Sequence, residues 1–177
     1  MSSSDVDDIV ARCQQDDSCA QKQLFETFGV NVYRLVHRIV GHNDADDLTQ
    51  EIFLQVFRKI GSFKGKAKFS TWLYRLATNA CLMHLRSVKR RKEVEEICEP
   101  PEISDGDRAF DAQELLDVAL SKLEPDLRAI FVLREIEQQN YDQLAVTLNI
   151  SPGTVASRLS RARQQLRDNL IELGWEP

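Results

Sequence analysis

Three arginines and four hydroxyl side chains lie in one short segment near the C-terminus, ISPGTVASRLSRARQQL, residues 150–166. Arginine can donate two hydrogen bonds at once to the O6 and N7 atoms of guanine, while serine and threonine bond to base edges or phosphates. Such side chains on one helix face predict contact with duplex DNA. Solubility alone is the alternative explanation for the charges. The candidate contact residues are Ser151, Thr154, Ser157, Arg158, Ser160, Arg161 and Arg163.

A second candidate lies in the first half of the chain, where FKGKAKFSTWLYRLATNACLMHLRSVKRRK interleaves cations with aromatic rings. Lysine and arginine neutralise phosphates, and exposed rings offer surfaces on which unstacked bases lie. Core packing is the alternative for the rings, above all for Trp72, and solubility is the alternative for the charges. The candidate residues are Ser62, Phe63, Lys64, Lys66, Lys68, Phe69, Trp72, Arg75, Asn79, Arg86 and Arg90.

The segment DADDLTQEIFLQVFRKI, which precedes this basic block, carries acidic and amide side chains beside apolar ones. An acidic face repels DNA and is complementary to a basic protein surface. The segment therefore predicts a docking face for a protein partner. Its candidate residues are Asp46, Asp47, Gln50, Glu51, Leu54 and Gln55.

The arginine-bearing segment requires a helix-turn-helix to position it. Asn140 and Gln143 have the spacing of a capping box, Asn149 suits a left-handed turn, and Ser151 with Pro152 can start the next helix. That helix is expected to bury the apolar residues that recur at intervals of four and three along one side. These are Val155, Leu159, Ala162 and Leu166.

Helical periodicity also fills the first half of the chain, with helix starts predicted at Ser18, at Asn43/Asp44 and at Ser70, and stops at Gly41 and Gly61. No stretch alternates with period two for long enough to predict a strand. The chain is therefore expected to be all-α, with two small helical domains.

Charge divides the chain in the same way, although its formal net charge is -5. Residues 20–92 hold 14 Lys/Arg and 5 Asp/Glu, whereas residues 93–117 hold 1 and 10. Because Pro100, Pro101 and Gly106 also fall in the acidic stretch, we expect a flexible linker there. The predicted divisions are a first domain over 1–92, a linker over 93–110 and a second domain over 111–177.

Several function classes find no support in the sequence. No paired carboxylates, phosphate-cradling loop or histidine-activated nucleophile is evident, so we expect neither an enzyme nor a cofactor. Cys13, Cys19, Cys81 and Cys98 form no CxxC pair, and a zinc site from Cys13, Cys19 and a histidine is a minor alternative. With no signal-like N-terminus and no long apolar run, a cytoplasmic protein is expected.

Four segments together resemble the sigma factors of the sigma-70 family, in the extracytoplasmic-function (ECF) group. LFETFGVNVYRLVHRIV resembles the first helix of sigma region 2, DADDLTQEIFLQVFRKI its polymerase-clamp segment and FSTWLYRLATNACLMHLRSVKRR its melting and minus-ten segment. LEPDLRAIFVLREIEQQNYDQLAVTLNISPGTVASRLSRARQQL resembles region 4. Asn149 stands where such turns often carry glycine. Ala156 and Ser160 are small where relatives can carry larger side chains. This difference affects which promoter sequence the resemblance predicts, but not the predicted activity.

The resemblance implies promoter-specific initiation of transcription with core RNA polymerase, whose clamp helices and flap would be the contact points. Region 4 would bind minus-thirty-five DNA, and region 2 would capture a flipped minus-ten base beside the loop from Ser62 to Lys68. An anti-sigma factor is a further partner that the resemblance implies. The alternatives are a stand-alone helix-turn-helix regulator and, more remotely, a signalling enzyme with a DNA-binding tail. The absence of a dimerisation stripe favours a monomer when free.

Overall fold

The computed structural model describes residues 3–95 and 112–175, and the predicted linker over 93–110 falls mostly outside these ranges. Four α-helices and a 3-10 turn form the first group. The helices are α1 (Ser3–Cys13), α2 (Ser18–Val40), α3 (His42–Lys59) and α4 (Phe69–Glu95), and the turn is η1 (Ile60–Ser62). Residues 63–68 form a loop between η1 and α4.

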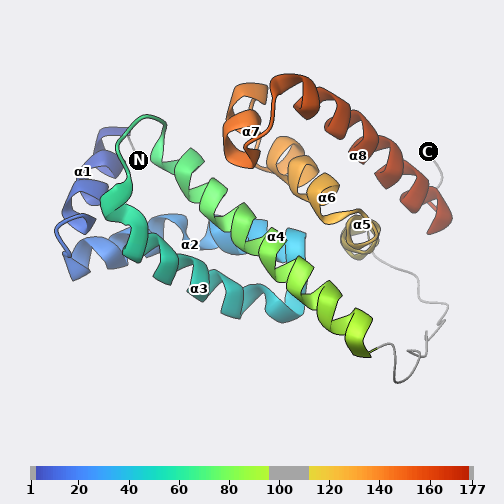
Figure 1. The fold of residues 1–177 in the computed structure, drawn as a ribbon, viewed down its shortest axis with the longest axis horizontal. Helices are drawn as coiled ribbons and strands as arrows, with labels where there is room; N and C mark the ends of the chain where they lie inside the picture. The colour runs from blue at the N-terminus through green and yellow to red at the C-terminus, as the bar shows by residue number, and fades with distance from the viewer. Residues whose placement is uncertain (1–2, 96–111, 176–177) are drawn as a thin grey trace.

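The second group contains four shorter or outer helices and one π-turn. The helices are α5 (Ala112–Ser121), α6 (Pro125–Phe131), α7 (Tyr141–Leu148) and α8 (Pro152–Glu172), with the π-turn η2 (Val132–Ile136) after α6. In Figure 1, α5 to α8 lie along one side of the long helix α4, and α8 is the outermost of them. The described residues contain no strand, so the predicted all-α, two-domain fold is confirmed.

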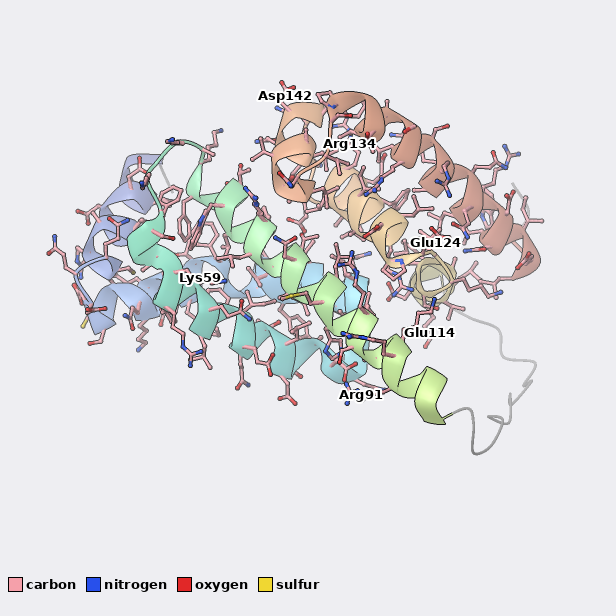
Figure 2. The ribbon with its side chains drawn as sticks, viewed as in Figure 1. Lys59, Arg91, Glu114, Glu124, Arg134 and Asp142 are labelled. Atoms are coloured by element: carbon pink, nitrogen blue, oxygen red, sulfur yellow. The ribbon has the colours of Figure 1, made fainter. Side chains whose placement is uncertain are left out.

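The two groups of helices pack against each other and share one hydrophobic core. Buried residues from α2, α3 and α4 belong to the same cluster as Leu127, Leu133, Leu144 and Leu159 of the second group. Figure 2 shows the side chains that occupy the space between the groups. The sequence predicted two domains but not this docking. No helix in the described ranges is long and apolar enough to cross a membrane.

The start of α2 differs from the expectation. Asp17, not Ser18, is the N-cap, and its carboxylate accepts hydrogen bonds from the amides of Cys19 and Ala20. The guanidinium of Arg12 holds the Asp17 carboxylate in the capping position. It donates hydrogen bonds to Oδ2 of Asp17 from Nε at 2.9 Å and from Nη2 at 2.7 Å. A charged cap at the positive end of a helix is favourable.

Two other helix starts also shift by one or two residues. The third helix starts at His42, before the predicted Asn43/Asp44, because Gly41 at φ 96° ends α2 and leads directly into α3. α4 starts at Phe69, one residue before Ser70, and η1 lies around Gly61. Phe69 is buried, so its packing contributes to where the helix starts.

The helix-turn-helix has the predicted geometry. Asn140 and Gln143 form the capping box of α7, and Asn149 ends that helix in the left-handed region at φ 54° and ψ 49°. Ser151 then caps α8, where Pro152 occupies the first turn. The four residues predicted to face inward are all buried: Val155, Leu159, Ala162 and Leu166.

Candidate nucleic-acid interface

The outer face of α8 carries most of its predicted contact residues on the surface. Ser157, Ser160, Arg161 and Arg163 are exposed, and the guanidinium of Arg161 has no hydrogen-bond or ion-pair partner among the described residues. The Ser151 side chain differs because its hydroxyl accepts from the amide of Thr154 at 3.2 Å. Ser151 is therefore occupied as a helix cap, whereas Arg161 is available to a ligand.

The two other predicted contact arginines of α8, Arg158 and Arg163, already have carboxylate partners. Arg163 donates to Oε1 of Glu135 from Nε at 3.1 Å and from Nη2 at 2.6 Å, and this pairing raises the pKa of its guanidinium. Arg158 lies 4.0 Å from Asp126 of α6. Both pairs are partly exposed, so each contributes little to stability and costs little to break.

An aromatic cluster supports the loop between η1 and α4. The ring centroids of Phe63, Phe69 and Trp72 lie 5.5 to 5.6 Å from one another, and Phe28 of α2 is 5.5 Å from Phe69. Phe69 is only 3% exposed, so the prediction that its ring offers a stacking surface is wrong for this conformation. It supports the partly buried Phe63 and Trp72, as core packing predicts.

The cations of the loop are exposed, as are the Lys and Arg side chains of α4 whose burial the structure describes. Lys64, Lys66 and Lys68 extend from the loop, and none has an ion pair among the described residues. One pocket of about 390 Å³ gathers many of the predicted contact residues with a single residue from α7. Its lining is Ser62, Phe63, Lys64, Lys66, Ala67, Thr71, Trp72, Arg75 and, from α7, Val146.

Further along α4, Asn79, Arg86 and Arg90 are exposed. Asn79 and Arg86 line a groove between α4 and the second group of helices. Leu148, at the end of α7, lines the same groove. Arg86 lies 3.8 Å from Asp126. The carboxylate of Asp126 thus faces a predicted contact residue of each domain, Arg86 of α4 and Arg158 of α8.

Helix α7 and the turn before it lie against α4. The hydroxyl of Tyr74 donates a 2.6 Å hydrogen bond to Oε2 of Glu137, which comes just after η2. Burial, together with this bond, raises the pKa of Tyr74. Arg134, labelled in Figure 2, stabilises the following turn by donating to the carbonyl of Gln139 at 2.8 Å. The α4 face that was predicted to contact DNA is therefore partly covered by the second domain.

A buried arginine joins α6 to α2. The guanidinium of Arg128 donates to the carbonyls of Ile39 at 2.8 Å and of Ser121 and Leu123. Burial lowers the pKa of Arg128, and its Nε has no hydrogen-bond partner among the residues that the structure describes. The Ile39 carbonyl lies at the C-terminal end of α2, where a cation is favourable.

Sequence reasoning missed Arg128, Asp126 and Glu137 as interdomain contacts. A charged residue between the buried Leu127 and Ala129 was a usable signal for Arg128. Tyr74 and Glu137 lie 63 residues apart, so no local pattern indicated their contact.

The predicted protein-docking face forms one stripe along α3. Asp46, Asp47, Gln50 and Glu51 are exposed, and Leu54 presents an apolar side chain that is 55% exposed. None of the three acidic residues has an ion pair among the described residues. Gln55, at the edge of the stripe, is partly buried and lines the groove beside α4.

The cysteines that the structure describes are not grouped. Cys13 and Cys81 are buried and Cys19 is exposed, while Cys98 lies outside the described residues. Burial raises the pKa of Cys81 to about 12, so its thiol stays protonated at neutral pH. Within the described ranges no three His, Cys, Asp or Glu side chains lie close enough together to hold a metal ion.

Comparison with known families supports both halves of this arrangement. Residues 24–91 match the family described as Sigma-70 region 2, and residues 113–166 match Sigma-70, region 4. These matches cover the basic block with its acidic neighbour and the helix-turn-helix.

Individual relatives extend the similarity over most of the chain. An ECF RNA polymerase sigma factor, SigE of Mycolicibacterium smegmatis, is 39% identical over 85% of this chain and 61% of its own length. The ECF RNA polymerase sigma-E factor of Haemophilus influenzae is 33% identical over 93% of this chain and 95% of its own. The chain therefore spans less than two thirds of the first relative and nearly all of the second.

A solved structure shows the same fold. The sigma factor RpoE of Bartonella quintana, in complex with the anti-sigma factor NepR, superposes with a TM-score of 0.69. The match is 23% identical and covers 85% of this chain and 96% of that one.

Proposed function

The chain belongs to the ECF sigma factors of the sigma-70 family, which are transcription initiation factors, and we propose that its helices divide promoter recognition as follows. Residues 1–92 bind core RNA polymerase and the minus-ten element, residues 93–110 link the domains, and residues 111–177 bind the minus-thirty-five element. The protein performs no catalysis of its own, and it works in the cytoplasm beside the polymerase.

The exposed face of α8 supports its role in reading duplex DNA. Arg161, which has no partner in the described structure, and Ser157 lie one turn apart and reach the same stretch of major groove. Arg158 and Arg163 flank them and exchange their carboxylate partners for phosphates. This exposed arginine without a partner in the described structure, between two arginines that pair with carboxylates, is the observation that carries the proposal.

The pocket beside the loop supports capture of a minus-ten base. A base that is read on its pairing edge must leave the stack, which costs a few kcal/mol. Trp72 and Phe63 supply partly exposed rings, and the loop lysines supply charge for the displaced strand. Further along α4, Asn79, Arg86 and Arg90 continue the same cationic surface.

The α3 stripe supports docking on the polymerase. Acidic side chains with an exposed leucine beside them complement a basic helix that carries an apolar patch. By family membership we assign this partner as the clamp helices, and we assign region 4 to the flap. An anti-sigma factor is a further proposed partner, in keeping with the complex formed by the Bartonella relative.

The observed docking of the domains adds a step to the proposal. Val146 lines the base pocket and α7 packs on α4, so part of this face is covered, and we propose that the second domain moves away before minus-ten DNA occupies it. Binding to polymerase, which separates the two domains along the promoter, supplies that movement.

Transcription with purified core polymerase tests the proposal. Core polymerase with this protein should produce discrete transcripts from a small set of promoters that core polymerase alone does not use. A chain that gave no such transcripts, yet bound a duplex operator tightly without polymerase, would be a stand-alone regulator.

A further inference from the structure

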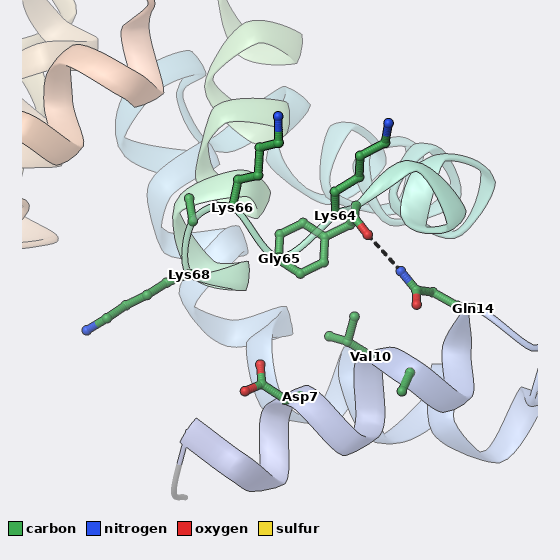
Figure 3. A pocket seen from close by; sticks show the side chains of 10 residues that line it. Asp7, Val10, Gln14, Lys64, Gly65, Lys66 and Lys68 are labelled. Atoms are coloured by element: carbon green, nitrogen blue, oxygen red, sulfur yellow. Dashed lines mark hydrogen bonds between the residues drawn. The ribbon is translucent and has the colours of Figure 1, made fainter.

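A single glutamine joins the N-terminal helix to the start of the base-capturing loop. Nε2 of Gln14, directly after α1, donates hydrogen bonds to the carbonyls of Ile60 and Phe63, each at 3.0 Å. Figure 3 draws the pocket between α1 and the loop, with Gln14 bonded across it. Helix α1 lies outside residues 24–91, so the region 2 match assigns it no role.

The backbone on both sides of Gln14 is anchored to its surroundings. Arg12 bonds to the carboxylate of Asp17, and Asp17 caps α2 through the amides of Cys19 and Ala20 at 2.8 and 3.1 Å. The hydrogen bond from Arg12 lowers the pKa of Asp17, so this carboxylate stays charged at neutral pH. Cys13, next to Gln14, is 1% exposed. The backbone that carries Gln14 is therefore tied to the start of α2.

Apart from the packing of the Phe63 ring on Phe69 and Trp72 of α4, the loop has few other constraints from outside its own sequence. Among the residues that the structure describes, its remaining hydrogen bonds are local, as from the Phe63 amide to Ile60 and from Ser62 to the Lys59 carbonyl. Gly65 has φ 68°, in the left-handed region that glycine adopts readily. Because glycine has no side chain, no side-chain contact restrains the loop at this position. The two bonds from Gln14 thus tie the entry of the loop to a different helix.

We propose that Gln14 is a positioning residue for minus-ten recognition. By fixing the Ile60 and Phe63 carbonyls, it sets where the Phe63 ring and the following lysines stand around the flipped base. Promoter preference at that base then depends on a helix that itself contacts no base. This inference rests on the proposed function, because it requires the loop to receive the base.

The test compares two variants with the same change of charge at neighbouring positions. Gln14→Glu keeps the side-chain shape but replaces the amide donor with a carboxylate, which repels both carbonyls. Gln15→Glu is the control, because Gln15 is exposed and its side chain has no hydrogen bond in the described structure. Transcription by core polymerase is measured on a promoter library that is randomised across the minus-ten element.

Gln14→Glu should reduce the preference for the favoured base by about fivefold, the effect of losing roughly one net hydrogen bond. Hydrogen exchange of the loop amides should rise in the same variant, whereas Gln15→Glu should match the wild type in both measurements. An unchanged base preference with Gln14→Glu, or an equal loss with Gln15→Glu, would overturn the inference.

A third variant separates this inference from the function on which it rests. Lys64→Ala combined with Lys66→Ala removes two exposed loop charges and leaves Gln14 in place. If this variant lowers transcription and Gln14→Glu leaves the preference intact, only the role of Gln14 is lost. If the lysine variant transcribes like the wild type on every promoter, the loop does not contact DNA and the proposed function of this region fails.

Discussion

Two surfaces of this protein are proposed to contact promoter DNA, and they differ in what covers them. The outer face of α8 is exposed, and its paired arginines have carboxylate partners within their own domain, Asp126 and Glu135. The face of α4 lies against α7, and Tyr74 bonds to Glu137 of the other domain. The structure thus leaves the proposed α8 surface exposed and covers part of the proposed α4 surface.

Because of this difference, the two proposed surfaces require different changes before they bind DNA. α8 can meet a duplex as it stands, because a phosphate only has to displace a partly exposed carboxylate. By the proposal, the α4 surface must first lose an interdomain interface that contains buried apolar residues and a buried arginine. Four predictions test this contrast, from the largest expected effect to the smallest.

Arg128→Ala should have the largest effect, because it removes the guanidinium that bonds across from α6 to the Ile39 carbonyl of α2. Three carbonyls lose their donor and a cavity remains, so the free energy of unfolding should fall by about 3 kcal/mol. Urea denaturation measures the fall. Arg167→Ala, at an exposed position on α8, is the control and should leave the midpoint unchanged. Equal midpoints for the two variants would show that Arg128 does not hold the domains together.

Arg161→Ala should relax sequence preference at one or two minus-thirty-five positions, at a cost of about 1–3 kcal/mol for the favoured base. Arg163→Ala should instead weaken transcription on all promoters alike and lower the salt dependence by about one phosphate contact. A randomised minus-thirty-five library at two salt concentrations distinguishes the two results. If Arg161→Ala kept the full preference, the exposed arginine would serve only to bind phosphate.

Tyr74→Phe removes one interdomain hydrogen bond and retains the ring. Because that bond contributes about 1 kcal/mol, the open form should become about five times more populated. Binding of single-stranded minus-ten DNA without polymerase should strengthen by the same factor. Tyr33→Phe, in α2 and away from this bond, provides the matched change and should bind like the wild type. No gain in Tyr74→Phe would mean that the Glu137 contact does not limit access.

Asp126→Asn should have the smallest effect. It removes the negative charge that lies 3.8 Å from Arg86 and 4.0 Å from Arg158, two partly exposed pairs worth about 0.5 kcal/mol or less. DNA affinity should rise by about twofold or less, and the rise should disappear at high salt. A large gain in DNA affinity that persists at high salt would show that Asp126 contributes more to the docking of the two domains than its exposure indicates.

The sequence predicted the parts of the molecule that short-range chemistry determines. Asn140, Asn149 and Ser151 each act on residues within a few positions, so the caps and turn of the helix-turn-helix could be identified from spacing alone. The buried stripe of α8 followed from helical periodicity.

The remainder depended on contacts between distant segments. Asp17, and not Ser18, caps α2 because Arg12 holds its carboxylate. Phe69 is buried because its ring packs against Phe28 of another helix, so it does not lie on the proposed DNA-binding surface. The π-turn that contains Arg134 and the docking of α7 on α4 likewise have no local signal. The DNA contacts and the α3 docking face remain predictions.

The distance between the domains in solution tests the central claim most directly. Single-molecule energy transfer between labels at Lys22 of α2 and Arg167 of α8, both exposed, reports on docking without disturbing the interface. The free protein should show one high-transfer population, and addition of core polymerase and promoter DNA should convert it to low transfer. A high-transfer population that persisted in a transcriptionally active promoter complex would contradict the claim that the α4 surface must be uncovered.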